Sequence, residues 1–310
     1  MKVAVCLAAG AVAAVLAGGP PDERSRVAPA NRPGAFDPTQ IQAIVVEKNE
    51  TDPASLKAVC GLGANTLVTH ANPDIATARA AWELNLFYIA RMTTQDVAQT
   101  AADMDYAARL RAVEGLSGIY YEDDEAEEGY ASPQTQQLAY DSLKVLFPGA
   151  LILHPTRLDP IASDPTYLNE FFRPQFTDLV TPYFYPVGTT VIGTFTEDGA
   201  WDSLLESLLR AVARQMPSGQ GVLPVLQGYE QIGFPVDRLF PRQQMEVYAR
   251  VWPANQNAAV FAWRIALPQP FIDLADQPLL QRGVCDLFAP LSTFARRCRW
   301  TGVVYRSRLP

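Results

Sequence analysis

The feature that most constrains this chain is a regular alternation of short apolar runs, rich in β-branched residues, with longer amphipathic stretches. Eight such runs begin roughly 20 to 43 residues apart, with no break in composition between them. They are IQAIVV (41–46), NTLVT (65–69), NLFYIA (85–90), LSGIYY (116–121), ALIL (150–153), DLVTPYF (178–184), GVLPVLQ (221–227) and AAVFAW (258–263). Strands that alternate with helical patterns indicate βα units. Eight of them predict an α/β fold with a single-domain (β/α)8 barrel, a TIM barrel, over residues 41–310.

The segments between the runs carry helix signals. Ser132 before Pro133 and Asp52 before Pro53 are each typical of an N-cap followed by proline at the first helical position. Pro241 suggests a third helix of this kind. The run from Trp201 predicts an amphipathic helix, because its apolar residues recur on one face: Leu204, Leu205, Leu208, Leu209, Val212 and Met216. After residue 268 the pattern predicts a short helix at 291–297 and a strand-like TGVVYR. It does not show which segment forms the eighth helix of the barrel.

The first 40 residues have a different character. Residues 1–19, MKVAVCLAAGAVAAVLAGG, place one lysine before an apolar stretch of small side chains, which is typical of a secretory signal peptide. The stretch is too short to span a bilayer. Residues 20–40 are rich in proline, glycine and arginine, and we expect a flexible leader there. The protein is therefore expected to be secreted or periplasmic, with no membrane contact after cleavage.

Charge and cysteine content narrow the function further. The 310 residues include 25 Lys and Arg against 33 Asp and Glu, a net charge of −8, which disfavours nucleic-acid binding. Cleavage of the signal peptide would remove Cys6 and leave Cys60, Cys285 and Cys298. An exported protein would pair two of them, and both a Cys60 bridge to either partner and a local Cys285–Cys298 bridge are open. We expect a monomer.

In a parallel barrel, the active site is formed where the strands end, and those positions are unusually polar here. The strand ends supply residues from all eight runs, and both histidines of the chain are among them. They are Glu47 with Lys48, His70, Arg91, Glu122 with Asp123 and Asp124, His154, Tyr183 with Tyr185, Gln227 with Tyr229 and Glu230, and Trp263 with Arg264.

The most informative run is GLSGIYYEDDEAEEGY, from Gly115 to Tyr130. A strand alternates its faces, so Tyr120, Glu122 and, if the extension continues, Asp124 point into the barrel together. Two carboxyls on one face tend to raise the pKa of one of them, which a general acid working near neutral pH requires. Asp124 is thus the candidate acid and Glu122 the neighbour that tunes its pKa.

This stretch resembles the fourth strand of (β/α)8-barrel glycoside hydrolases, as in family 18 chitinases, where the pattern is D-G-x-D-x-D-x-E. Residues 117–124 keep the glycine and carry carboxylates at the last two acidic positions, with Ser117 and Tyr120 at the first two and Asp124 in place of the final Glu. The stretch is also similar to the G-Y-Y-x-x-D-E-P strand end of other glycosidase barrels. TPYFYP and AVFAW are similar to their sixth and eighth strands. The resemblance implies a glycoside hydrolase with Asp124 as the acid.

A glycosidase that uses two carboxyls needs a partner for that acid. Glu230, at the end of the seventh run, is the first choice, and Glu47 is the alternative. Aromatic rings at the strand ends would stack on sugar rings and offer hydrogen bonds. The expected carbohydrate-binding residues are Glu47, His70, Arg91, Tyr120, His154, Tyr183, Tyr185, Gln227, Tyr229, Trp263 and Arg264. No cofactor and no metal ion are expected.

Other classes fit less well. A metal-dependent barrel hydrolase would use His70, His154, Glu47 and Asp124 as ligands, but no H-x-H pair lies on the first run. The sequence has neither the G-x-S-x-G of serine hydrolases nor a G-x-G-x-x-G after the first strand. A non-catalytic carbohydrate-binding or cell-envelope barrel remains the alternative from a different class.

Overall fold

The computed structural model describes residues 35–46, 49–70, 73–122, 132–164, 166–190, 193–263 and 271–289. Contacts between Cα atoms separate residues 1–32 from a second unit, residues 33–310. The signal peptide predicted at residues 1–19 and most of the leader lie outside the described residues. All that follows concerns the second unit.

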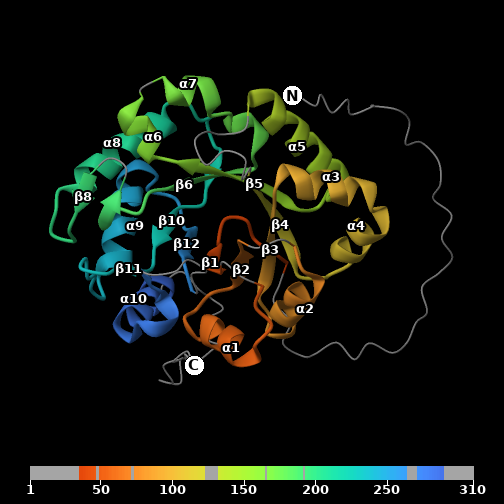
Figure 1. The fold of residues 1–310 in the computed structure, drawn as a ribbon, viewed down its shortest axis with the longest axis horizontal. Helices are drawn as coiled ribbons and strands as arrows, with labels where there is room; N and C mark the ends of the chain where they lie inside the picture. Colours follow the sequence, from red (N-terminus) through yellow and green to blue (C-terminus); the bar gives the residue numbers. More distant parts are fainter. Residues whose placement is uncertain are drawn as a thin grey trace. The chain divides into compact units, whose positions relative to one another are not determined.

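The described strands form the predicted (β/α)8 barrel (Figure 1). Its parallel strands are β1 (Gln42–Val46), β2 (Thr66–Thr69), β3 (Phe87–Met92), β4 (Leu116–Tyr121), β5 (Leu151–Arg157), β6 (Leu179–Tyr183), β9 (Gly221–Val222) with β10 (Val225–Gln227), and β12 (Ala258–Phe261). Strands β9 and β10 together make the seventh position, which is interrupted at Leu223 and Pro224. The pairing of Tyr183 with Val225 joins β6 to β10, and β12 pairs with both β10 and β1, so the sheet closes on itself.

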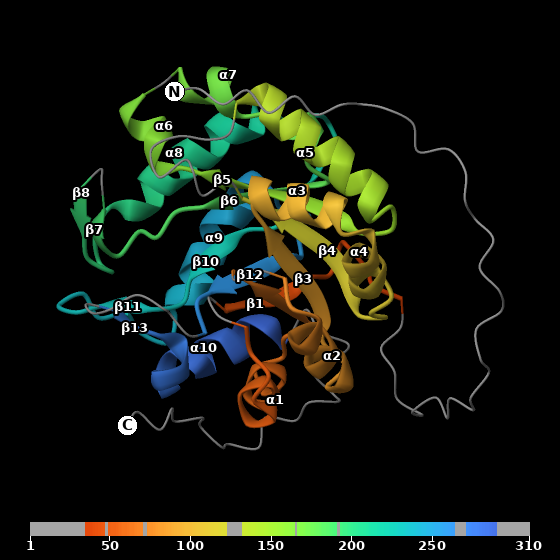
Figure 2. The same ribbon diagram turned by 45° about the vertical axis from the view of Figure 1, so that its right-hand side comes forward.

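Helices surround this sheet (Figures 1 and 2). They are α1 (Pro53–Gly61), α2 (Ile75–Glu83), α3 (Thr94–Ala102), α4 (Met104–Arg111), α5 (Pro133–Leu146), α6 (Asp159–Ser163), α7 (Tyr167–Phe171), α8 (Trp201–Ala213), α9 (Phe240–Val251) and α10 (Pro278–Phe288). Two short antiparallel pairs lie outside the barrel sheet: β7 (Gly188–Thr190) with β8 (Gly193–Phe195), and β11 (Glu230–Gln231) with β13 (Phe271–Ile272). Among the described residues, no helix is long and apolar enough to span a membrane.

The helix starts follow the local sequence signals. The Asp52 side chain accepts a hydrogen bond from the amide of Ala54, and Ser132 does the same for Thr135, so both prolines begin helices as predicted. Helix α8 buries the expected apolar face. The eighth helix was left open, and the structure supplies it as α10, in a segment whose proline also occupies the first turn. The helix predicted at 291–297 and the strand-like TGVVYR lie outside the described residues.

The barrel has two separate apolar cores. The larger one lies between the strands and the helices, and the smaller one fills the barrel interior with Val45, Val68, Ile89, Leu153 and their neighbours. The alternation of side chains along each strand decides which core a residue joins. Gly118 belongs to the interior face of β4, where a Cβ atom would lie 3.3 Å from the side chains of both Ile89 and Leu153. The absence of a side chain at this position therefore lets the two neighbours fill the interior.

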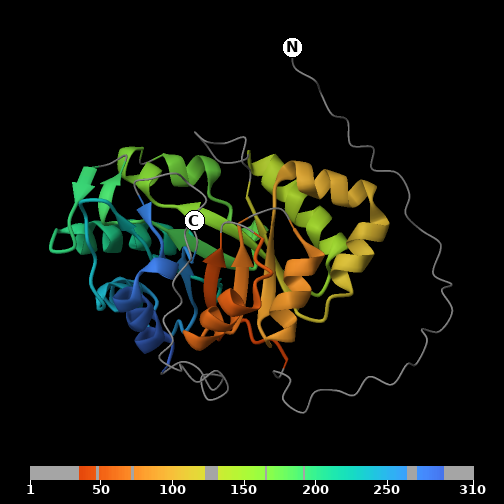
Figure 3. The ribbon, with the colours of Figure 1, turned by 60° about the horizontal axis from the view of Figure 1, so that its bottom comes forward.

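Residues 35–40, which their composition assigns to the leader, pack against the amino end of the barrel. The ring of Phe36 contacts that of Phe87 edge-on, with centroids 5.0 Å apart, and it joins the interior core. Asn257 anchors the same end, because its side chain accepts from the amide of Ile41 and donates to the carbonyls of Pro38 and Val222. Viewed from the direction of Figure 3, the strands β1 and β2 stand beside α1 at the front of the barrel.

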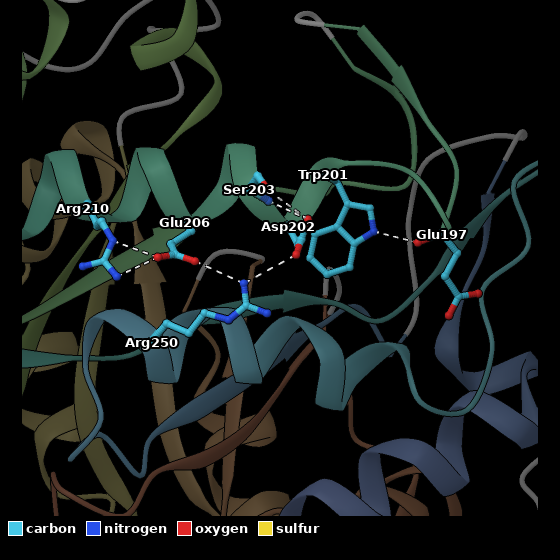
Figure 4. Close-up of polar contacts among 7 residues, drawn as sticks. All are labelled: Glu197, Trp201, Asp202, Ser203, Glu206, Arg210 and Arg250. Atoms are coloured by element: carbon cyan, nitrogen blue, oxygen red, sulfur yellow. Dashed lines mark hydrogen bonds and ion pairs between the residues drawn. The ribbon is translucent and has the colours of Figure 1, made fainter.

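An ion-pair cluster joins α8 to α9 on the outer surface (Figure 4). The guanidinium of Arg250 contacts carboxylate oxygens of Asp202 at 3.5 Å and Glu206 at 3.1 Å. Glu206 also binds Arg210 at 2.7 Å, one helical turn further along α8. Figure 4 also shows Trp201, whose indole nitrogen donates to the carbonyl of Glu197. We call Asp202, Glu206, Arg210 and Arg250 the outer cluster.

The state of the cysteines excludes one of the predicted disulfide pairings. Cys60, in α1, is disulfide-bonded, and Cys285, in α10, is free. The local Cys285–Cys298 bridge is therefore not formed. Cys298 itself lies outside the described residues.

Candidate active site in the barrel cavity

A cavity of about 170 Å³ lies at the carboxyl end of the barrel strands. Most of its wall is apolar, and its ionisable side chains, apart from tyrosines, are those of His70 and Glu122. The described lining consists of Val45, Val68, His70, Ile89, Tyr120, Glu122, Leu153, Tyr183, Tyr185, Leu223, Val225, Ala259 and Phe261. This is the end at which (β/α)8-barrel enzymes carry their active sites.

The strand ladder positions the two ionisable residues. His70 follows β2, and its amide donates to the carbonyl of Val46 on β1. Glu122 follows β4, and its amide donates to the carbonyl of Met92 on β3. Both residues thus continue the sheet by one step, so their side chains are held by ordered backbone.

Glu122 binds two basic side chains through a single oxygen. Its Oε2 lies 2.7 Å from Nε2 of His70 and 2.9 Å from Nε of Arg91. Arg91 lies on β3 with its side chain only 8% exposed. No hydrogen bond from a described residue reaches the other carboxylate oxygen, Oε1. We call His70, Arg91 and Glu122 the inner cluster.

This arrangement sets the protonation state of Glu122. Burial by itself would raise the pKa of the carboxyl, but the hydrogen bond and charge of His70, together with Arg91, outweigh it and lower the pKa to about 2. The sequence led us to expect like-charge repulsion near this position to raise a pKa. For Glu122 the direction is the opposite, because its two basic neighbours come from β2 and β3. Glu122 is ionised at neutral pH.

An aromatic wall completes the cavity. Tyr185 stacks on Phe261 with centroids 5.2 Å apart and an angle of 12° between the rings, and Tyr183 lies 5.6 Å from Tyr185. Tyr229 packs edge-on behind Tyr185 at 5.4 Å. Burial raises the pKa of Tyr183 and Tyr185, as it does for Tyr120, so the lining phenols stay neutral. The cavity lining includes Tyr120, Tyr183 and Tyr185.

Three other predicted site residues lie apart from the cavity lining. His154 belongs to the opposite face of β5, beside a small pocket with Tyr167 and Arg173, where burial lowers its pKa to about 4. The buried side chain of Gln227 bonds to the backbone of Val187 through both its oxygen and its nitrogen. Trp263 is fully buried in the larger core between the strands and the helices, and its indole donates to Ser55.

Glu230 also lies outside the cavity lining. It forms part of β11, which pairs with β13, and its Oε1 accepts from the amide of Val236 at 3.4 Å. The strand that carries the seventh position ends at Gln227, so the chain has already left the barrel at Glu230. Glu47, Asp124 and Arg264 lie outside the described residues, as do Lys48 and Asp123.

Sequence reasoning missed Phe261 and the aliphatic part of the lining. Phe261 is the last residue of β12 and alternates correctly with Ala259, so the period of the strand could have identified it. Trp263 was predicted as a binding residue from its residue type instead. His70 and His154 face different pockets and so make no joint metal site. Within the described ranges, no group of three or more His, Cys, Asp or Glu side chains could hold a metal ion.

Comparison with known proteins places the fold. No family model and no curated protein matches the sequence. Among solved structures, a GH2 β-galacturonidase from Eisenbergiella tayi has a TM-score of 0.55 at 12% identity, covering 88% of this chain and 52% of its own. The Bacillus cereus spore cortex-lytic enzyme SleL has a TM-score of 0.52 at 9% identity, with 81% and 74% covered.

A third similar structure is an endo-β-mannanase/endo-β-glucanase from Prevotella bryantii, with a TM-score of 0.51 and 12% identity, covering 82% of this chain and 48% of that one. The chain thus spans about half of the galacturonidase and of the mannanase/glucanase. Its structural neighbours are glycoside hydrolases, and at these identities the likeness shows the shared (β/α)8 fold.

Proposed function

We propose that this protein is a glycoside hydrolase that cleaves the O-glycosidic bonds of an oligo- or polysaccharide, and that it is secreted or periplasmic. One observation carries the proposal: an ionised carboxylate, Glu122, lines an aromatic-walled cavity at the catalytic end of a (β/α)8 barrel. The glycoside hydrolases among the similar structures support the same class.

Glu122 supplies the negative charge that the reaction needs. Breaking a glycosidic bond develops positive charge at the anomeric carbon, and a nearby carboxylate stabilises it, as a nucleophile or as the base for a water molecule. Because His70 and Arg91 both bind Oε2, Oε1 is the oxygen left for this task. Glu122 thereby takes the part that the sequence assigned to Glu230.

Asp124 is our proposed acid. It stands two residues beyond Glu122 in the sequence, and it would donate its proton to the glycosidic oxygen as the bond to the anomeric carbon breaks. A water molecule then adds its hydroxyl to the anomeric carbon and forms the new reducing end. The proton that this water loses replaces the one that Asp124 donated, so the acid form is restored at the end of the cycle. The cycle consumes one water for each bond broken.

The first test is a screen of the purified protein against a broad panel of poly- and oligosaccharides, with Asp124→Asn as the paired variant. We expect new reducing ends from at least one substrate and loss of that activity in a folded Asp124→Asn protein. The anomer of the first product then distinguishes retention from inversion. Full activity in Asp124→Asn would refute the assignment of the acid.

A non-catalytic carbohydrate-binding barrel is the second candidate. The observation in its favour is that Glu122 is the one Asp or Glu side chain in the described cavity lining. If no substrate in the panel is cleaved but saccharides still bind, this reading replaces the first.

A further inference from the structure

Three hydroxyl groups in the cavity lining have no partner in the described part of the protein. Tyr120, Tyr183 and Tyr185 all line the cavity, and no hydrogen bond contributes to the shift of their pKa values, which burial dominates. These hydroxyls are not sealed in the core, so without a protein partner they are open to water or to a ligand in the cavity. Three such groups around one cavity suit a ligand with several hydrogen-bonding groups.

Neutral phenols suit a particular kind of ligand. Each can donate one hydrogen bond and accept another, as the hydroxyls of a sugar also do. Glu122 Oε1 adds a fourth acceptor at the same cavity. These groups come from β4, from β6 and from the segment just beyond it, so they would surround a ligand rather than contact a single edge.

The size and floor of the cavity restrict the ligand further. Its volume of about 170 Å³ falls below the ~300 Å³ at which pockets for drug-sized ligands begin. Val45, Val68, Ile89, Leu153 and Val225 line the part toward the barrel interior. This floor offers no hydrogen bond, so it suits the C–H face of one ring.

Charge gives the last restriction. Both basic groups of the inner cluster already bind Glu122, and the rest of the described lining is apolar or phenolic. The carboxylate of a uronic acid would lose its hydration there without gaining a counter-ion from the described lining. The ammonium of an amino sugar could reach only Oε1 of Glu122, a carboxylate whose charge Arg91 already balances.

We infer that the cavity binds a single neutral sugar ring, with Tyr120, Tyr183, Tyr185 and Glu122 as its hydrogen-bond partners and the aliphatic floor beneath it. This inference deepens the proposed function and rests on it for the class of ligand. It assigns the substrate class as a neutral sugar, held one ring at a time.

The test measures binding, so it does not depend on catalysis. Ligand-observed NMR titrations of the full chain would use glucose, galactose and mannose as neutral probes, and glucuronate and glucosamine as charged ones. We expect at least one neutral sugar to bind about 10-fold more tightly than either charged sugar. Tyr120→Phe, Tyr183→Phe and Tyr185→Phe should each weaken that binding about 3- to 10-fold, since each removes one hydrogen bond and keeps the ring.

A matched control separates this role from a structural one. Tyr248 lies in the larger core between the strands and the helices, and its hydroxyl donates to the carbonyl of Pro182. Tyr248→Phe should lower the melting temperature and leave sugar affinity unchanged. The three cavity variants should show the reverse, with wild-type melting temperatures and reduced affinity, because their hydroxyls have no protein partner to lose.

Two results would overturn the inference: charged sugars that bind at least as well as every neutral one, or cavity variants that melt earlier but bind normally. These failures differ from failure of the proposed function. Neutral sugars that bind through the three tyrosines, without hydrolysis of any glycan, would refute the enzyme and uphold the neutral-ring site. Hydrolysis with preferred binding of glucuronate would uphold the enzyme and refute that site.

Discussion

The inner and outer clusters are built from similar residues but lie in different surroundings. The contrast lies in the arginines: Arg91 is 8% exposed, whereas Arg210 and Arg250 are 52% and 47% exposed. The carboxylates Glu122 and Glu206 are similarly exposed, at 22% and 24%. Arginine hydrogen bonds lower the pKa of Glu206 as well as that of Glu122. Only the inner carboxylate, however, faces a cavity.

The difference shows that solvent decides what an ion pair does. Water and salt screen the outer cluster, so its contacts add little to the stability of α8 against α9. The inner cluster has lost much of its water, and its interactions are correspondingly stronger. An arginine–carboxylate pair is therefore a surface contact in the outer cluster. In the inner cluster it holds a charged carboxylate at the cavity.

Removing the carboxylate of each cluster should give the largest contrast. Glu122→Ala removes the carboxylate that both Arg91 and His70 bind, and we expect the free energy of unfolding to fall by about 3 kcal/mol. Glu206→Ala should leave the unfolding midpoint unchanged within error. Urea denaturation of the two variants and the wild type measures both effects, and equal losses would break the comparison.

The second prediction concerns acid stability. The pKa of Glu122 is lowered in the folded state, so its contribution is complete above the unfolded value of 4.5 and is lost as the pH falls toward about 2. The shift corresponds to roughly 3 kcal/mol. Glu122→Gln should lack this part of the pH dependence, so the difference in unfolding free energy between wild type and variant should shrink from pH 5 to pH 2. A difference that stays constant over that range would contradict the lowered pKa.

The smallest expected effect is at the outer cluster. Arg250→Gln removes the contacts to both Asp202 and Glu206. Because the pairs are exposed, we expect no measurable change in melting temperature at 0.15 M salt and none at higher salt. A clear loss of stability that salt abolishes would show that solvent screens the outer cluster less than its exposure indicates.

The sequence was a good guide to the framework. All eight strand runs are strands of the barrel, because their apolar residues fill one core or the other, and the caps at Asp52 and Ser132 begin helices as predicted. It left the eighth helix, α10, unassigned within the proline-containing segment after residue 268, where Pro278 in fact lies in the first turn.

The site was predictable in part. Alternation along β4 placed Tyr120 and Glu122 at the cavity, but residue type alone wrongly drew attention to the position of Trp263, where β12 has already ended. The direction of the Glu122 pKa shift could not be predicted from the sequence. Arg91 lies 31 residues earlier in the chain and contacts Glu122 only when the strands pair. Contacts between distant strands are decided by register, which the sequence does not reveal directly.

The most direct test compares two isosteric variants, Glu122→Gln and Glu230→Gln, on a substrate that the wild type cleaves. The structure places Glu122 at the cavity and Glu230 in the β11–β13 pair. We predict that kcat falls about 10²- to 10⁴-fold in Glu122→Gln, with the fold retained by circular dichroism, and stays near the wild-type value in Glu230→Gln. A fully active Glu122→Gln enzyme would contradict the account.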